Sequence, residues 1–224
     1  MVALKYPTLA LSAAAASLAA PTERIERSSE PNFELDVTLD LVKRQNYTQD
    51  YVTSGTVNYS PSSNGYSVTY SGAGDFVVGK GWSTGSTSRA ITFSGSTSAT
   101  AGTNLVSLYG WSTNPLVEYY VQECYTGGSA GQGTVKGTLT SDGSTYTVYE
   151  HQQVNQPSIQ GTTTFSQYIS VRSSQRCSGG TITFANHVKQ WASYGMNLGT
   201  MNYQTISTEG WGGASGSSNY TVSG

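Results

Sequence analysis

The sequence predicts an all-β fold, a sandwich or jelly roll, and two observations carry that prediction. Apolar and aromatic residues alternate with polar ones, as where Tyr66, Val68 and Tyr70 are separated by single polar residues. Clusters of Gly, Ser, Asn and Asp interrupt the alternation, for example at 62–65 and 141–144. Side chains of a strand alternate between two faces, and these residue types favour turns. The pattern therefore indicates many short strands joined by regular turns.

The amino-terminal part predicts two segments that precede the folded domain. Residues 1–19 have the early cation, the apolar Leu/Ala run and the small final residues of a signal peptide, and the run is too short to span a membrane. Residues 20–44 are acidic and end in the dibasic pair Lys43-Arg44. We read them as a pro-segment removed after Arg44, with a solvated acidic linker as the alternative. The mature domain is then 45–224, and we expect it to be secreted to the extracellular space.

The mature domain is nearly uncharged, because residues 45–224 keep only seven acidic and six basic side chains. That balance offers no basic footprint for nucleic acid or for an anionic membrane. A chain of this length is expected to form one domain with a sizeable core, and we expect a monomer. No metal-ligand cluster, phosphate loop or serine-nucleophile motif is visible, so we predict no metal and no cofactor.

Further stretches share the alternating pattern and are predicted strands: 105–111, 117–123, 145–150, 163–172 and 202–209. Residues 185–194 differ, because Val188 and Trp191 recur there at helical spacing before Gly195, a natural helix stop. We predict one amphipathic helix packed on a sheet. His187 lies inside it and is expected in the packed core rather than as a ligand or a base.

The chain has two cysteines, Cys124 and Cys177. An even count in a secreted protein indicates one disulfide, and two unpaired thiols are the alternative.

Two glutamates, Glu118 and Glu209, lie within aromatic, strand-like stretches where charges are scarce. Strand alternation places Glu118 and Tyr120 on one face and Glu123 on the other. Other strands also group aromatic with polar side chains, namely Tyr203 with Glu209, Tyr109 and Trp111 with Ser107, and Phe165 with Gln167. Such faces suit a sugar site, although the aromatic residues are equally compatible with a core. Two carboxyls converging on one cleft are the minimum equipment for cleaving a glycosidic bond.

The chain resembles the family 11 glycoside hydrolases, small secreted endo-1,4-β-xylanases, over about 74–223. Ordered motifs carry the resemblance: Asp75-Phe76-Val77-Val78-Gly79-Lys80-Gly81-Trp82, Leu108-Tyr109-Gly110-Trp111, Asn114-Pro115-Leu116-Val117-Glu118-Tyr119-Tyr120, Asn155-Gln156-Pro157-Ser158-Ile159-Gln160-Gly161, Asn186-His187, Gly195-Met196-Asn197-Leu198-Gly199 and Thr208-Glu209-Gly210-Trp211. The resemblance implies a jelly roll of two curved antiparallel sheets with one α-helix, and xylan as the partner.

The resemblance also implies a retaining double displacement with Glu118 as nucleophile and Glu209 as acid/base. Asp75 matches a position occupied by Asn or Asp, and Asp resembles the acid-active kind, in which it shares a hydrogen bond with the acid/base. We therefore expect Asp75→Asn to raise the pH optimum. Tyr109 and Tyr120 match tyrosines that contact the nucleophile and the bound sugar.

The remaining site residues implied by the resemblance contact the xylan chain. Residues 155–161 match a mobile "thumb" hairpin, whose Pro157 and Ser158 cover the cleft. The other matched positions are Phe165, Gln167, Tyr203 and a stacking aromatic, for which we prefer Tyr51 over Tyr47.

Two departures from the family bear on the rate. Gln153 stands where an arginine is usual, and Ile169 stands where a tryptophan is common. We interpret the chain as a secreted, acid-active endo-1,4-β-xylanase. The alternative is a xylanase-like carbohydrate-binding or host-recognised protein with little turnover, and a β-glucanase is a weaker third reading.

Overall fold

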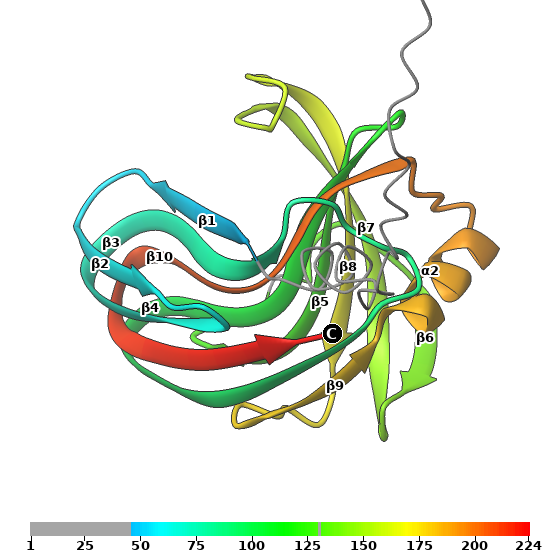
Figure 1. The fold of residues 1–224 in the computed structure, drawn as a ribbon. Coiled ribbons are helices and arrows are strands. Elements are labelled where there is room, and N and C mark those ends of the chain that lie inside the picture. Colours follow the sequence, from blue (N-terminus) through cyan, green and yellow to red (C-terminus); the bar gives the residue numbers. More distant parts are fainter. Residues whose placement is uncertain (1–45, 130) are drawn as a thin grey trace, which may run out of the picture.

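The computed structural model describes residues 46–129 and 131–224. Within these ranges ten strands and one helix follow in order (Figure 1): β1 Tyr47–Val52, β2 Thr56–Pro61, β3 Gly65–Trp82, β4 Ala90–Thr113, β5 Val117–Thr126, β6 Thr134–Ser141, β7 Ser144–Gln156, β8 Thr163–Arg172, β9 Gly179–Thr183, α2 Phe184–Ser193 and β10 Thr200–Ser223. The predicted all-β jelly roll with a helix is confirmed. The predicted signal peptide and pro-segment lie outside the described residues.

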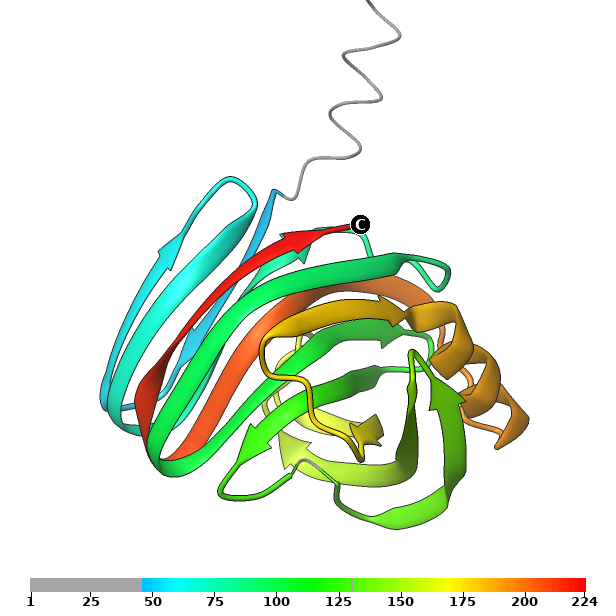
Figure 2. The same cartoon turned by 90° about the horizontal axis from the view of Figure 1, so that it is seen from below.

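The strands form two curved layers that share three long strands, β3, β4 and β10 (Figures 1 and 2). In one layer, β2 pairs with the first part of β3, and β9 pairs with the first part of β4. In the other layer, the strands lie in the order β1-β3-β10-β4-β5-β8-β7-β6. Because hydrogen bonding continues through the shared strands, the two expected sheets are joined into one path. Every pair is antiparallel except β5 with β8, which is parallel. Sequence alternation could not reveal that exception.

The passage between the layers lies at a break in the register of β10. Its pairing with both neighbours shifts after Trp211 and resumes regularly at Gly216. Gly212 and Gly213, inside this break, have φ of 68° and 79°, which residues with a Cβ rarely adopt. Such irregularities bend a strand and increase its twist. The glycines that follow Glu209 therefore let the strand turn away from the cleft immediately after it.

The principal core lies between the two layers and under the helix. Its largest fully buried side chains include Trp191, Tyr119, Tyr146, Tyr220 and Phe76. Helix α2 buries Trp191, whose Nε1 donates to Ser170 Oγ over 3.0 Å. Figure 2 shows this helix at one side of the curled sheet, after β9 and beside β6.

The predicted helix is confirmed with its start one residue earlier. It spans Phe184–Ser193, and Gly195 follows with a φ of 81°. His187 is fully buried and packs edge-on against Tyr146 at 4.7 Å between ring centroids. Burial lowers the pKa of His187 to about 3, so the ring is neutral. It belongs to the core as expected, although neither ring nitrogen has a hydrogen-bond partner among the described residues.

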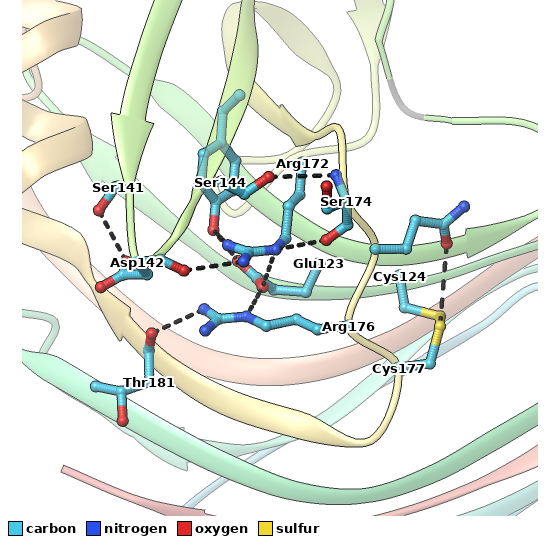
Figure 3. A network of polar contacts seen from close by, with 12 residues as sticks. Glu123, Cys124, Ser141, Asp142, Ser144, Arg172, Ser174, Arg176, Cys177 and Thr181 are labelled. Carbon is cyan, nitrogen blue, oxygen red and sulfur yellow. Dashed lines mark hydrogen bonds and ion pairs between the residues drawn. A yellow bond between two sulfur atoms is a disulfide. The ribbon is translucent and has the colours of Figure 1, made fainter.

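A buried ion-pair network closes the far end of β5 (Figure 3). Glu123, which is 1% exposed, accepts hydrogen bonds from Arg176 Nε and, over 2.8 Å, from the Tyr146 hydroxyl. Arg172 Nε lies 3.9 Å from the same carboxylate. The predicted disulfide is confirmed, because Cys124 is bonded to Cys177. The crosslink joins β5 to the segment that carries Arg176, and it therefore holds the network together.

Candidate active site

Strand pairing brings the two predicted carboxyls to one cleft. Glu118 on β5 lies opposite Trp111 of β4 and Gln167 of β8. Glu209 on β10 lies opposite residues of β3 and β4. Both glutamates line a cavity of about 320 Å³. The same cavity is lined by every other predicted site residue: Asp75, Tyr109, Tyr120, Tyr51, Pro157, Ser158, Phe165, Gln167 and Tyr203.

Glu118 is buried but surrounded by neutral hydrogen-bond donors. The Tyr109 hydroxyl donates to its Oε1 and Gln167 Nε2 donates to its Oε2, each over 2.7 Å. Trp111 Nε1 in turn donates to the Tyr109 hydroxyl over 2.9 Å and fixes its orientation. Burial raises the pKa of Glu118, and the hydrogen bonds from Gln167, Tyr109 and Tyr120 oppose that rise because they stabilise the ionised form.

Glu209 is half-buried and has far less support for a negative charge. Its pKa is raised well above the usual value by burial first, then by the charges of Glu118 and Asp75. Only Tyr120 acts in the opposite direction. Two neighbouring carboxyls whose environments separate their pKa values can divide acid and base roles. The arrangement favours Glu118 as the carboxylate and Glu209 as the protonated acid.

Asp75 lies at the cleft, half-buried, and burial raises its pKa. Within the described residues no hydrogen bond joins it to Glu209, contrary to the shared bond that the resemblance implied. Asp75 instead acts on the pair through its charge, which raises the pKa of both Glu118 and Glu209.

The predicted thumb is the hairpin that joins β7 to β8, the yellow segment projecting at the top of Figure 1. Its tip is held by hydrogen bonds between Ser158 and Gly161, including Ser158 Oγ to the Gly161 carbonyl over 2.6 Å. Pro157, Ser158 and Ile159 line the cavity from this hairpin. The residues expected to cover the cleft are therefore part of its wall.

Aromatic rings line the part of the cleft nearest β1. Tyr47 stacks on Tyr203 with ring centroids 4.5 Å apart and an interplanar angle of 18°. Tyr51, the aromatic that we preferred, also lines the cavity and is 37% exposed. Phe165 packs against Trp111 at 4.8 Å. Apart from Tyr51, these rings belong to a small hydrophobic cluster and also form the wall of the cleft. The aromatic faces therefore act both as a core and as the lining of a site.

A second cavity, of about 340 Å³, continues the cleft past the carboxyl pair. It is lined by Glu209 but not by Glu118, and it extends to Ile169, Trp211 and Gln132. Ile169, at the position where tryptophan is common, is 1% exposed and belongs to the same apolar cluster that Trp211 packs against. Trp211 therefore provides an aromatic ring of this cavity beside Tyr120, a role that its place in the 208–211 motif had not indicated.

Gln153, at the usual arginine position, also lines the cleft and donates from Nε2 to Gln167 Oε1 over 3.3 Å. His151 was given no role from the sequence, but its Nδ1 lies 2.8 Å from the same oxygen. The signal that could have found it is strand alternation, because His151 and Gln153 are two residues apart and share a face.

In residues 46–129 and 131–224 no group of three or more His, Cys, Asp or Glu side chains is arranged to hold a metal ion. No helix in those ranges is long and apolar enough to cross a membrane.

Comparison with known proteins identifies the family. The model of glycosyl hydrolases family 11 matches residues 43–221. "Endo-1,4-beta-xylanase 1" of Hypocrea jecorina (strain QM6a) is 53% identical over 233 residues, which cover 100% of both chains. "Ethylene-inducing xylanase 2" of Botryotinia fuckeliana (strain B05.10) is 51% identical over 226 residues, again over 100% of both.

A solved structure agrees with these matches. It comes from a structural comparison of two major endo-1,4-β-xylanases of Trichoderma reesei and is 58% identical, with a TM-score of 0.77. The match covers 81% of this chain and 99% of that one. With the family model spanning most of the chain and relatives aligned along its whole length, the protein belongs to the family 11 glycosyl hydrolases.

Proposed function

We propose that the protein is an endo-1,4-β-xylanase that cleaves internal bonds of xylan with retention of the anomeric configuration. The observation that carries this proposal is the unequal environment of the two cleft carboxyls. Three hydrogen bonds support the charge of Glu118, whereas burial and two neighbouring carboxyls keep a proton on Glu209. One ionised and one protonated carboxyl are what the first step of a double displacement requires.

In that first step, Glu118 attacks the anomeric carbon and forms a covalent glycosyl-enzyme. Glu209 gives its proton to the departing glycosidic oxygen, so the leaving chain departs as a neutral alcohol. The bonds from Tyr109 and Gln167 hold both oxygens of Glu118 and fix the direction of attack.

The second step reverses the roles. Glu209 is now a carboxylate and removes a proton from a water molecule, which attacks the same carbon and releases Glu118. Once Glu118 is esterified its negative charge is gone, so the pKa of Glu209 falls and a carboxylate there becomes favourable. The charge interaction between the two groups thus serves both steps.

The shape of the cleft supports cleavage within a chain rather than at its end. The cavity toward Tyr47 and the thumb, and the cavity toward Trp211, meet at Glu209 and Asp75. A polysaccharide would lie in both. Because the second cavity includes the acid and not the nucleophile, we assign it to the departing part of the substrate. The relatives named as endo-1,4-β-xylanases support xylan as that substrate.

We also propose activity at acid pH. Burial raises the pKa of Asp75, so this carboxyl also takes up a proton as the pH falls. We take the productive state to be the one in which Asp75 as well as Glu209 holds a proton, and two neighbouring carboxyls are both protonated only at lower pH. The signal peptide predicted at residues 1–19 supports secretion, and we propose that the enzyme is a monomer.

The test is release of reducing sugar from soluble xylan, compared between the wild type and Glu118→Gln, with the first product's anomeric form followed by NMR. We expect β-product from the wild type and at least about a thousandfold less release from the variant. Equal release from both proteins, or α-product, would contradict the proposal. Xylan binding without release would support the carbohydrate-binding alternative.

A further inference from the structure

A relay of hydrogen bonds leads from the thumb strand to Glu118. His151 on β7 lies directly opposite Gln167 on β8. The side-chain oxygen Oε1 of Gln167 lies 2.8 Å from His151 Nδ1 and accepts a hydrogen bond from Gln153 Nε2 over 3.3 Å. The amide nitrogen of Gln167 donates onward to Glu118 Oε2 over 2.7 Å.

Donor and acceptor capacities fix the direction of this relay. An ionised carboxylate can only accept, so Gln167 must turn its NH₂ toward Glu118. Its Oε1 then faces β7 and can only accept as well. The nearest nitrogen, His151 Nδ1, must therefore carry a proton, which selects one tautomer of the neutral ring and is equally satisfied by the cation.

We propose that His151 is a positioning residue for the hydrolytic reaction, acting with Gln153 to hold the amide of Gln167 against Glu118. The inference rests on the proposed role of Glu118 as the ionised nucleophile. It also gives Gln153 a function at the position where the family usually has an arginine: a neutral donor pair on one carbonyl oxygen organises the nucleophile.

The physical effect of the pair is on the orientation of one amide. Without the donors on β7, the Gln167 side chain is free to turn its oxygen toward Glu118, which would repel the carboxylate. The bond from Gln167 lowers the pKa of Glu118, so its loss would raise that pKa. The other titratable groups facing Glu118 stay in place: Tyr109, Tyr120, Asp75 and Glu209. Beside His151, Lys136 of β6 and Glu150 of β7 are paired with each other at 2.8 Å.

The experiment titrates the Glu118 carboxyl by NMR in protein carrying ¹³C-labelled glutamate, alongside kcat/KM on xylan. His151→Ala should raise the pKa of Glu118 and lower kcat/KM about fivefold, the effect of one ordinary hydrogen bond. His151→Asn keeps a donor at the place of Nδ1 and should restore both values. Gln152→Ala, one residue along β7 and exposed, is the matched control and should change neither.

An unchanged pKa of Glu118 in His151→Ala would overturn the proposal, as would a failure of His151→Asn to restore it. Thermal unfolding of the three variants separates positioning from damage to the fold, since a purely structural role would lower stability in both His151 variants without restoring the pKa in Asn. The titration does not require turnover. If the wild type failed to hydrolyse xylan, the proposed function would fail while the titration would still decide the role of His151.

Discussion

Two glutamates five residues apart on β5 face different surroundings. Glu118 and Glu123 are both buried, at 8% and 1% exposure, and burial raises the pKa of each. Glu123 faces the core and forms an ion pair with the guanidinium of Arg176, with Arg172 close by. Glu118 faces the cleft and accepts its hydrogen bonds from neutral donors, Tyr109 and Gln167.

The difference indicates a structural role for Glu123 and is consistent with the catalytic role proposed for Glu118. A guanidinium that binds a carboxylate neutralises it and occupies its lone pairs. Neutral donors stabilise the ionised form of Glu118 and orient it, but they do not neutralise the negative charge with which it is proposed to attack a carbon. That same unneutralised charge raises the pKa of Glu209. The absence of a nearby arginine at Gln153 therefore suits Glu118, provided that other donors hold its oxygens.

The largest expected effect comes from replacing Glu118, the glutamate that faces the cleft. Glu118→Gln should reduce xylan hydrolysis at least about a thousandfold, because an amide cannot act as the nucleophile. The fold should survive, since the amide is isosteric and loses a buried charge. Steady-state rates and thermal unfolding measure the two parts. Retained activity in a folded variant would show that Glu118 is not the nucleophile.

The next largest effect is expected from removing the disulfide beside Glu123. Replacing both Cys124 and Cys177 by Ala opens a loop with a sequence separation of 53. Chain entropy predicts a loss of about 4 kcal/mol in the free energy of unfolding. Urea unfolding measures this loss, and activity per folded molecule should be unchanged. A marked fall in kcat at full folding would mean that the crosslink also shapes the cleft.

Breaking the ion pair itself should cost slightly less. Glu123→Gln leaves two arginine side chains in a buried setting without their counter-charge, which should lower the free energy of unfolding by about 3 kcal/mol. The pH profile of the enzyme should stay the same, because Glu123 faces away from the cleft. If this variant were as inactive as Glu118→Gln while still folded, the contrast between the two glutamates would be wrong.

The smallest expected effect adjusts the charge around Glu209. Asp75→Asn removes the second carboxyl that must hold a proton in the proposed productive state, so the pH optimum should move upward. Rates on xylan between pH 3 and pH 8 measure the shift, with Asp50→Asn on exposed β1 as the control. An optimum that stays in place or moves down would remove Asp75 from the account of acid activity.

Strand alternation and motif order predicted much of this molecule. The alternation placed Glu118 and Glu123 on opposite faces, and every site residue predicted from the family resemblance lines the cavity. The helix was predicted to within one residue. These features depend on local pattern, which a single sequence records well.

Other features depend on partners far along the chain. The register of His151 against Gln167 follows from a hairpin that contains an irregularity between Gln153 and Gln156, and alternation alone does not set such a register. The parallel pairing of β5 with β8, which places Gln167 beside Glu118, is also invisible in the pattern. For this reason Glu118 was predicted as a site residue, whereas the contact of His151 with Gln167 was not.

The most direct test of the account identifies the residue that bonds to the sugar. The protein is incubated with a 2-deoxy-2-fluoro-β-xylobioside bearing a good leaving group, which slows release of the covalent intermediate, and the product is mapped by peptide mass spectrometry. The account predicts one fluoroxylobiosyl adduct, on Glu118. An adduct on Glu209 or elsewhere, or hydrolysis of the reagent with no adduct formed, would contradict it.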